Sequence, residues 1–161
     1  MDMAFGEAGE GRAWAGRRSD LRPADFPVCE GMIRSYCALV EDANPRYWED
    51  GESPPGMISV WSFPPPWSPG GRPRRYLFAL EVPLPGRHIV NVSYDGEYRR
   101  PIRAGERLLI HDEVVAVSEE KMTRLGRGHF ITTRTTFQVE EEVVAIKTNV
   151  LYRYDTEELE R

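Results

Sequence analysis

The carboxyl half of the chain constrains its fold most, because its side chains alternate with a period of two. Between positions 131 and 139, one face of the predicted strand carries Ile131, Thr133, Thr135, Phe137 and Val139, and the intervening positions carry Thr132, Arg134, Thr136 and Gln138. Such alternation is typical of a strand with one buried face. Runs of strand character also span about 87–98, 107–118 and 143–154. Short turns rich in Gly or Glu separate the last three runs, so we expect an antiparallel meander.

A single amphipathic helix precedes these strands. Its apolar positions recur at three- and four-residue spacing, and they are Cys29, Met32, Ile33, Tyr36, Cys37 and Val40. Asp25 and Pro27 suit the start of this helix, which we expect to end near Glu41. The sheet must cover the apolar stripe of the helix. The sequence therefore predicts an α+β fold in which an antiparallel sheet wraps around one central helix.

Length and composition predict one domain. The chain has 161 residues, of which 40% are apolar, and a formal net charge of −5. That length accommodates one core, and the negative charge disfavours nucleic acid and anionic membranes as partners. No apolar run reaches the roughly 20 residues that span a bilayer, and the amino terminus lacks a secretory pattern, so we expect a cytoplasmic protein. Residues 1–12 are rich in Gly, Ala and Glu, which predicts a flexible tail before a domain over residues 13–161.

Proline punctuates the segment after the helix. Prolines flank the apolar stretch from Met57 to Phe63, which leaves room for a turn or two of helix. Gly70 and Gly71 then precede three arginines and predict an exposed loop. These arginines are Arg72, Arg74 and Arg75.

A motif directly after the predicted helix connects the sequence to a known family. Asp42-Ala43-Asn44-Pro45-Arg46-Tyr47 resembles the D-x-N-P-x-H signature of the MaoC-like acyl-CoA hydratases and dehydratases, which have the hot-dog fold. Three further segments, over residues 54–61, 98–106 and 121–130, resemble the non-catalytic MaoC-like domains of actinobacterial steroid-degrading hydratases. In order, they begin Pro54-Pro55-Gly56-Met57, Tyr98-Arg99-Arg100-Pro101 and Lys121-Met122-Thr123-Arg124. The resemblance covers roughly residues 13 to 154.

The resemblance implies catalytic roles for two residues of the motif, and Tyr47 replaces one of them. In catalytic members, the aspartate and histidine of the motif activate a water that adds to an α,β-unsaturated acyl-CoA. Here Asp42 and Asn44 match the motif, but Tyr47 stands at the position of the histidine. A phenol keeps its proton until about pH 10 and is a poor base at neutral pH. We therefore interpret the motif as degenerate, with Asp42 and Asn44 either holding the turn or retaining a catalytic role together with Tyr47.

The family also contains enzymes built from two hot-dog halves, of which one has a degenerate site. The resemblance thus implies a subunit of a heteromeric enoyl-CoA hydratase, a hydro-lyase that acts on an acyl-CoA such as a steroid side-chain thioester. A second hot-dog subunit would carry the intact motif. Coenzyme A would enter as part of the substrate, and no separate cofactor is expected. Hot-dog domains also resemble one another in pairing edge to edge, so we expect a dimer or a dimer of heterodimers.

Several residues outside the motif are candidates for substrate binding. Met57, Ile58, Trp61, Phe63 and Trp67 either line an acyl- or sterol-sized cavity or pack over the helix or against a partner subunit. Arg99, Arg100 and Arg103 either meet the phosphates of coenzyme A or lie on a solvated sheet edge.

The three histidines predict no metal site, because His88, His111 and His129 lack the close spacing of ligands. His88 is the candidate for a substitute base, although an ordinary surface or core histidine is the simpler interpretation.

Two other functions remain open at the level of sequence. One is a self-sufficient hot-dog homodimer that acts as a hydratase through another residue or as an acyl-CoA thioesterase. The other is an acyl-CoA-binding module without chemistry. Turnover by the chain alone, or tight acyl-CoA binding without turnover, distinguishes these from the heteromeric subunit.

Overall fold

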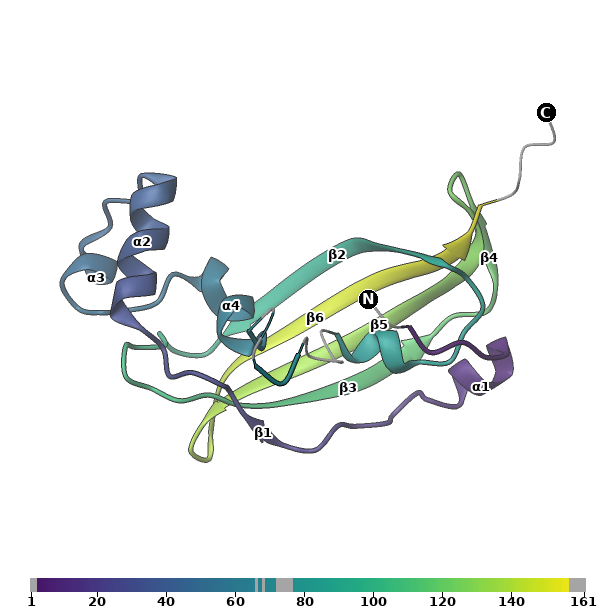
Figure 1. Ribbon diagram of the computed structural model, residues 1–161, viewed down its shortest axis with the longest axis horizontal. Helices are drawn as coiled ribbons and strands as arrows, with labels where there is room; N and C mark the ends of the chain where they lie inside the picture. The colour runs from purple at the N-terminus through teal and green to yellow at the C-terminus, as the bar shows by residue number, and fades with distance from the viewer. Residues whose placement is uncertain (1–2, 66, 68, 72–76, 157–161) are drawn as a thin grey trace.

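A long antiparallel sheet dominates the molecule (Figure 1). The computed structural model describes residues 3–65, 67, 69–71 and 77–156. The strands are β1 (Arg22–Pro23), β2 (His88–Tyr98), β3 (Leu109–Val117), β4 (Lys121–Thr123), β5 (Gly126–Val139) and β6 (Glu142–Asp155). They lie in the order β1-β3-β5-β6-β2, and β4 pairs with β5. The four strand runs predicted from the sequence are thus confirmed, with bounds that differ by a few residues.

The strand order differs from the predicted meander at one place. β3, β5 and β6 follow one another as neighbours, but β2 pairs with β6 rather than with β3. The connection over residues 99–108 explains the difference. It passes across the end of the sheet, where Ile102 and Leu108 are buried in the core. β2 therefore forms one margin of the sheet, and its outer backbone edge pairs with no strand of the described residues.

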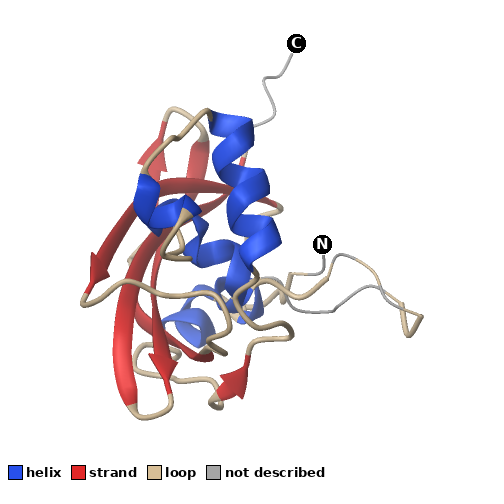
Figure 2. Ribbon diagram, turned by 90° about the vertical axis from the view of Figure 1, so that its left-hand side faces the viewer, coloured by secondary structure: helices blue, strands red, loops and turns tan. Residues whose placement is uncertain are grey.

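Short helices cover the inner face of the sheet (Figure 2). They are α1 (Ala8–Arg12), α2 (Glu30–Val40), α3 (Pro45–Trp48) and α4 (Ile58–Ser62), with the 3₁₀ helices η1 (Pro55–Met57) and η2 (Phe78–Glu81). α2 is the predicted amphipathic helix, and the predicted turn or two over residues 57–63 is also confirmed. No described helix is long and apolar enough to span a membrane.

The core has two separate apolar clusters because α2 is much shorter than the sheet. Eleven helical residues span roughly 16 Å, whereas the fourteen-residue strands span roughly 46 Å. α2 buries Ile33 and Cys37 against one end of the sheet, where Phe137 and Ala145 lie. η2 covers the other end. It joins the cluster Phe78, Ala79, Val82, Leu84, Val114, Ile131 and Leu151. The sheet thus wraps its helix over one end only (Figure 1).

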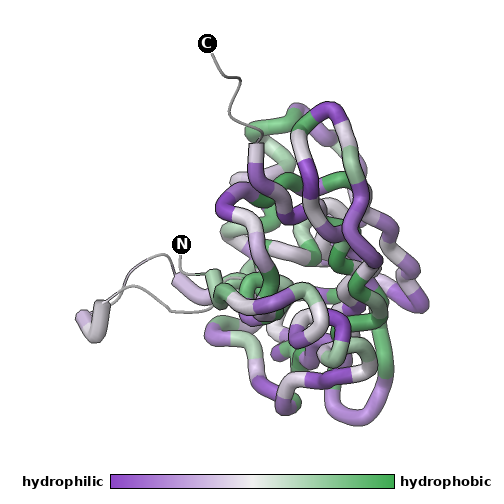
Figure 3. Tube along the Cα trace, turned by 90° about the vertical axis from the view of Figure 1, so that its right-hand side faces the viewer, coloured by the Kyte–Doolittle hydropathy of each residue, from purple (hydrophilic) through white to green (hydrophobic). Residues whose placement is uncertain are grey.

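Alternation along the strands follows the prediction. Ile131 and Phe137 are buried, and Arg134 on the opposite face is exposed. The same exchange of hydrophilic and hydrophobic residues is visible along the chain in Figure 3.

The flexible tail predicted for residues 1–12 does not hold for the described residues. Ala4 donates its backbone N–H to the Leu80 carbonyl at 2.8 Å, and α1 begins at Ala8. Gly11 is buried against Leu84, in a space that would not admit a Cβ atom. The glycines that suggested flexibility therefore include one that permits close packing. The loop predicted around Arg72, Arg74 and Arg75 lies outside the described residues.

Candidate functional site

The degenerate motif forms the turn after α2. Glu41 ends the helix in the left-handed conformation, with φ of 56°. The Asp42 Oδ1 atom accepts the backbone N–H of Asn44 at 3.0 Å, and the Asn44 Oδ1 atom accepts that of Arg46 at 3.2 Å. Asn44 is therefore the N-cap of α3, with Pro45 in its first turn. Both polar side chains of the motif bond to the local backbone.

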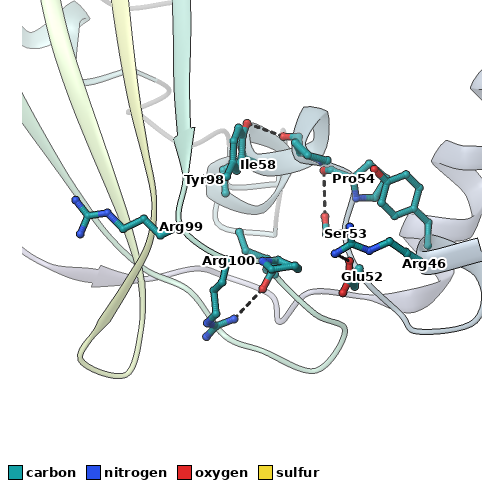
Figure 4. Close-up of a pocket in the computed structure, with 12 residues that line it drawn as sticks. Arg46, Glu52, Ser53, Pro54, Ile58, Tyr98, Arg99 and Arg100 are labelled. Carbon is teal, nitrogen blue, oxygen red and sulfur yellow. Dashed lines mark hydrogen bonds and ion pairs between the residues drawn. The ribbon is translucent and has the colours of Figure 1, made fainter. Parts of the chain in front are cut away.

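Two residues of the motif, Arg46 and Tyr47, line a cavity. The cavity has a volume of about 280 Å³ and lies between α3, the segment at residues 52–55 and the end of β2 (Figure 4). The lining residues are Arg46, Tyr47, Glu52, Ser53, Pro54, Pro55, Ile58, Tyr98, Arg99, Arg100, Pro101 and Ile102. Four of the predicted site residues meet here, namely Tyr47, Ile58, Arg99 and Arg100.

Hydrogen bonds between segments that are distant in the sequence join the walls of this cavity. The Ser53 N–H donates to the Ile102 carbonyl at 2.7 Å, and the Ala104 N–H donates to the Gly51 carbonyl at 2.8 Å. Tyr98 donates its hydroxyl to the Pro55 carbonyl at 2.8 Å (Figure 4). The segment before α4 is thereby tied to the end of β2 and to the connection that follows it.

Glu52 is a buried carboxylate that the sequence did not identify. Only 5% of Glu52 is exposed, and its carboxylate pairs with Arg46 at 2.7 Å and Arg103 at 3.3 Å. A buried charge requires such partners. A single glutamate between Gly51 and Ser53 gives no sequence signal, because its role depends on two arginines from separate segments.

Two of the predicted phosphate-binding arginines, Arg99 and Arg100, already have partners within the chain. Arg100 pairs with Glu106 at 2.9 Å and with Glu142 at 2.8 Å, and its side chain is 28% exposed. Arg99 pairs with Glu97 at 3.1 Å, is exposed, and extends away from the other labelled residues (Figure 4). Arg99 is thus the more accessible of the two for an external anion.

The described lining of this cavity offers few groups that could act as a general acid or base. Its described lining contains no histidine, cysteine or aspartate. Glu52 is held by two arginines. Burial, together with the hydrogen bond to Tyr94, raises the pKa of Tyr98 well above its usual range. No group in the lining is therefore arranged as a general base for neutral pH.

The predicted apolar lining divides between core and cavities. Met57 and Trp61 are buried in the core, and the Trp61 Nε1–H donates to the Ser53 Oγ atom at 2.9 Å. Ile58 belongs to the same core and also lines the first cavity. Phe63 is 38% exposed and lines a second cavity over the inner face of the sheet.

His88 lies apart from the motif. It begins β2, whereas Tyr98 ends that strand at the cavity, so the two are separated by roughly 33 Å along the strand. The exposed His88 ring contacts Tyr154, with centroids 5.4 Å apart. The structure therefore does not bring His88 and Tyr47 into one site within a single chain.

Comparison with known sequences identifies the family. Residues 13–147 match the family described as FAS1-like, dehydratase domain region. A protein of Thermomonospora curvata is named as a probable enoyl-CoA hydratase alpha subunit. It is 29% identical over an alignment of 170 positions, gaps included, and the alignment covers 93% of this chain. The chain spans about half the length of that relative, namely 52%.

Comparison with solved structures gives the same fold. A chain of the ChsH1–ChsH2 complex from Mycobacterium tuberculosis is 26% identical with a TM-score of 0.73, and the match covers 92% of this chain and 94% of that one. A MaoC-like dehydratase is 20% identical with a TM-score of 0.66, over 89% of this chain and 43% of that one. The hot-dog fold predicted from the sequence is thus confirmed. The chain belongs to the FAS1-like dehydratase region family and has the hot-dog fold.

Proposed function

We propose that this chain is the non-catalytic subunit of a heteromeric enoyl-CoA hydratase, and that a second hot-dog subunit supplies the acid/base histidine. The observation that carries the proposal is Tyr47, which occupies the histidine position and faces a cavity whose described lining contains no imidazole. The similarity to an enoyl-CoA hydratase alpha subunit supports the reaction class. The similarity to a chain of the ChsH1–ChsH2 complex supports a heteromeric assembly.

The chemistry of hydration explains why a partner is needed. Water must lose a proton as its oxygen attacks the β-carbon of the enoyl thioester, and the α-carbon must gain one. A group that exchanges protons near neutral pH performs both steps well, and imidazole is the usual one. Glu52 is tied to two arginines, and Tyr98 holds its proton tightly because of its raised pKa. In our proposal, this chain therefore binds and orients the acyl group, and the partner moves the protons.

The exposed margin of the sheet supports the assembly. β2 carries Val90, Val92 and Tyr94, which are 37%, 52% and 45% exposed. An eleven-residue edge strand with exposed valines is a template for pairing with another strand. We propose that β2 pairs with the corresponding strand of the partner subunit and brings the partner's motif towards this chain.

In this proposal, the substrate is an acyl-CoA, and no separate cofactor takes part. Arg99 is the residue we propose for the phosphates of coenzyme A, since its guanidinium is exposed and has one partner at 3.1 Å. Within the acyl-CoA class, medium-chain esters and steroid side-chain esters are the substrates to compare.

The first prediction concerns activity with and without the partner. We expect no measurable hydration of enoyl-CoA esters by the chain alone and turnover by the co-purified pair. In the pair, Tyr47→Phe should change kcat by less than about threefold, because a phenol that is not the acid or base contributes little to the barrier. The assay follows loss of the enoyl thioester absorbance.

Three outcomes decide between this proposal and its alternatives. Robust hydration by the chain alone contradicts it and favours a self-sufficient homodimer. Release of free coenzyme A by the chain alone favours a thioesterase. Tight acyl-CoA binding with no turnover in the pair favours a binding module. The partner's histidine-to-alanine variant serves as the control, and it should abolish turnover.

A further inference from the structure

The middle of the inner sheet face is polar, although both of its ends are apolar. The residues of this polar band are Asp112 on β3, Thr133 and Thr135 on β5, and Lys147 and Asn149 on β6. Thr135 pairs in register with both Asp112 and Lys147, and Thr133 pairs with Asn149, so the five side chains project from one face. On β6, Ala145 precedes the band and Leu151 follows it, one in each apolar cluster.

Part of the band is satisfied within the chain. The Thr135 hydroxyl donates to Asp112 at 2.7 Å, and Arg22 lies 3.8 Å from the same carboxylate. The hydrogen bond and the ion pair satisfy these polar groups in the part of the sheet that neither α2 nor η2 covers. Lys147 and Asn149 are the members of the band whose polar atoms remain incompletely paired.

Lys147 holds its ammonium group over the second cavity. It donates to the Ser59 Oγ atom at 2.7 Å and lies 4.9 Å from the centre of the Tyr94 ring. Asp112 on the same sheet face favours the charged form of Lys147, but no carboxylate among the described residues lies within ion-pair distance of it. Burial lowers the pKa of this lysine, as expected for a charge that has lost solvent. An ammonium has three donors, so donors remain for a ligand.

Asn149 has a buried acceptor without a donor. The residue is 8% exposed, and its Oδ1 atom makes no hydrogen bond. An unmatched buried polar atom costs stability, and such atoms are rare in folded proteins. Lys147 and Asn149 are two positions apart on one strand face, so they can act on the same ligand.

The second cavity surrounds these two residues with mostly apolar and aromatic side chains, together with the polar Ser59 and Asn91. Its volume is about 530 Å³, and its walls include Phe63, Leu77, Tyr94 and Leu151. Tyr98 lines both this cavity and the one at Tyr47. The two cavities therefore share Tyr98 as a wall, so the polar band lies next to the cavity at the motif.

We infer that Lys147 and Asn149 recognise a hydroxyl group on the acyl chain of the substrate, so that this subunit selects oxygenated acyl groups. The inference rests on the proposed acyl-CoA function. A hydroxyl oxygen accepts from the ammonium of Lys147, and its proton is donated to the Asn149 Oδ1 atom. A ketone satisfies only the lysine, a carboxylate brings a second acceptor to the Asn149 oxygen, and a hydrocarbon leaves both residues unpaired.

The test measures binding of saturated medium-chain acyl-CoA esters, which need no turnover. The series contains the unsubstituted ester, isomers with a hydroxyl at successive positions towards the end of the chain, and the matching ketones. Calorimetry uses the chain alone and co-purified with its partner. We expect one hydroxyl isomer to bind about tenfold more tightly than the unsubstituted ester, with the ketone in between.

Matched variants connect the preference to the two residues. Lys147→Met and Asn149→Leu should each remove most of the tenfold preference and leave binding of the unsubstituted ester within about threefold. Lys121→Met, which changes an exposed lysine on β4, should keep the preference. Circular dichroism confirms that each variant is folded.

The outcomes separate this inference from the function on which it rests. Equal binding of all esters, or a preference that survives in both variants, overturns the inference and leaves the proposed function standing. Failure of every ester to bind, alone and with the partner, overturns both.

Discussion

Lys147 shows how a single residue can favour ligand binding over stability. Its position on β6 lies between Ala145 and Leu151, both buried, yet it carries a charge that burial disfavours. Stabilising a protein often costs function where a site contains such groups. Lys147 and Asn149 fall on the face of β6 that also carries the buried Ala145 and Leu151.

The pH dependence of stability tests the state of Lys147. Burial lowers the pKa of Lys147 in the folded chain, whereas in the unfolded chain the lysine titrates near pH 10.4. Between these two pH values the unfolded chain therefore binds more protons than the folded chain. The free energy of unfolding therefore rises with pH in this window. We expect Lys147→Met to be more stable than the wild type by about 1 kcal/mol at pH 7, and the difference should shrink as the pH approaches 10.4. Urea unfolding at several pH values measures it.

Lys121→Met is the control for this experiment, because Lys121 is exposed. Its effect on the free energy of unfolding should not vary over the same pH range. A difference between wild type and Lys147→Met that stays constant with pH would contradict a lowered pKa for Lys147.

At the scale of elements, α1 contains two glycines whose surroundings cannot be inferred from composition. Gly9 and Gly11 belong to the same short helix, but a Cβ atom at Gly9 meets nothing within 4 Å, whereas one at Gly11 clashes with Leu84. A glycine count cannot distinguish the two positions. The difference arises from Leu84, which lies more than 70 positions along the chain and takes part in the second apolar cluster.

These two glycines provide a matched pair of substitutions. We expect Gly11→Ala to lower the free energy of unfolding by about 2 kcal/mol, because the added methyl group must push α1 away from Leu84. Gly9→Ala should be neutral or raise stability by up to about 1 kcal/mol through helix propensity. Limited proteolysis near the amino terminus should accelerate for Gly11→Ala alone. Equal rates for the two variants would show that α1 does not dock through Gly11.

Strands were easier to predict than the way they join. β5 alternates with a period of two over residues 131–139, which few other structures produce. Partner choice has no local signal, and β2 joins β6 because the connection through Ile102 crosses the end of the sheet. The two-residue β1 was missed for the same reason, since only Leu109 and Ile110 opposite it define it as a strand.

The candidate site was predicted only where a motif marked it. Tyr47 stood out because it replaces a histidine in a short signature. Glu52 and Tyr98 did not, because their roles come from contacts between segments about 50 residues apart. The motif therefore locates the cavity, and the tertiary structure supplies most of its walls.

For the whole molecule, the exposed margin at β2 should determine assembly. We expect Val92→Lys to weaken self-association or association with the partner by at least tenfold, because a charge at the middle of an edge strand opposes strand pairing. Light scattering coupled to gel filtration measures the assembly state. Leu125→Lys at the β4–β5 turn, where the leucine is 46% exposed, is the matched control and should leave assembly unchanged. Intact assembly of Val92→Lys would place the interface elsewhere.

The pairing of β2 with β6 also has a consequence during protein synthesis. β2 is synthesised before β3, β5 and β6, and the strand that completes its only pairing in the described chain ends at Asp155. At about 5 to 20 residues per second, that wait lasts roughly 3 to 11 seconds. Throughout it, both backbone edges of β2 and its two valines lack their partner strand. We expect a nascent chain of this topology to bind chaperones, or an already folded partner, until β6 is complete.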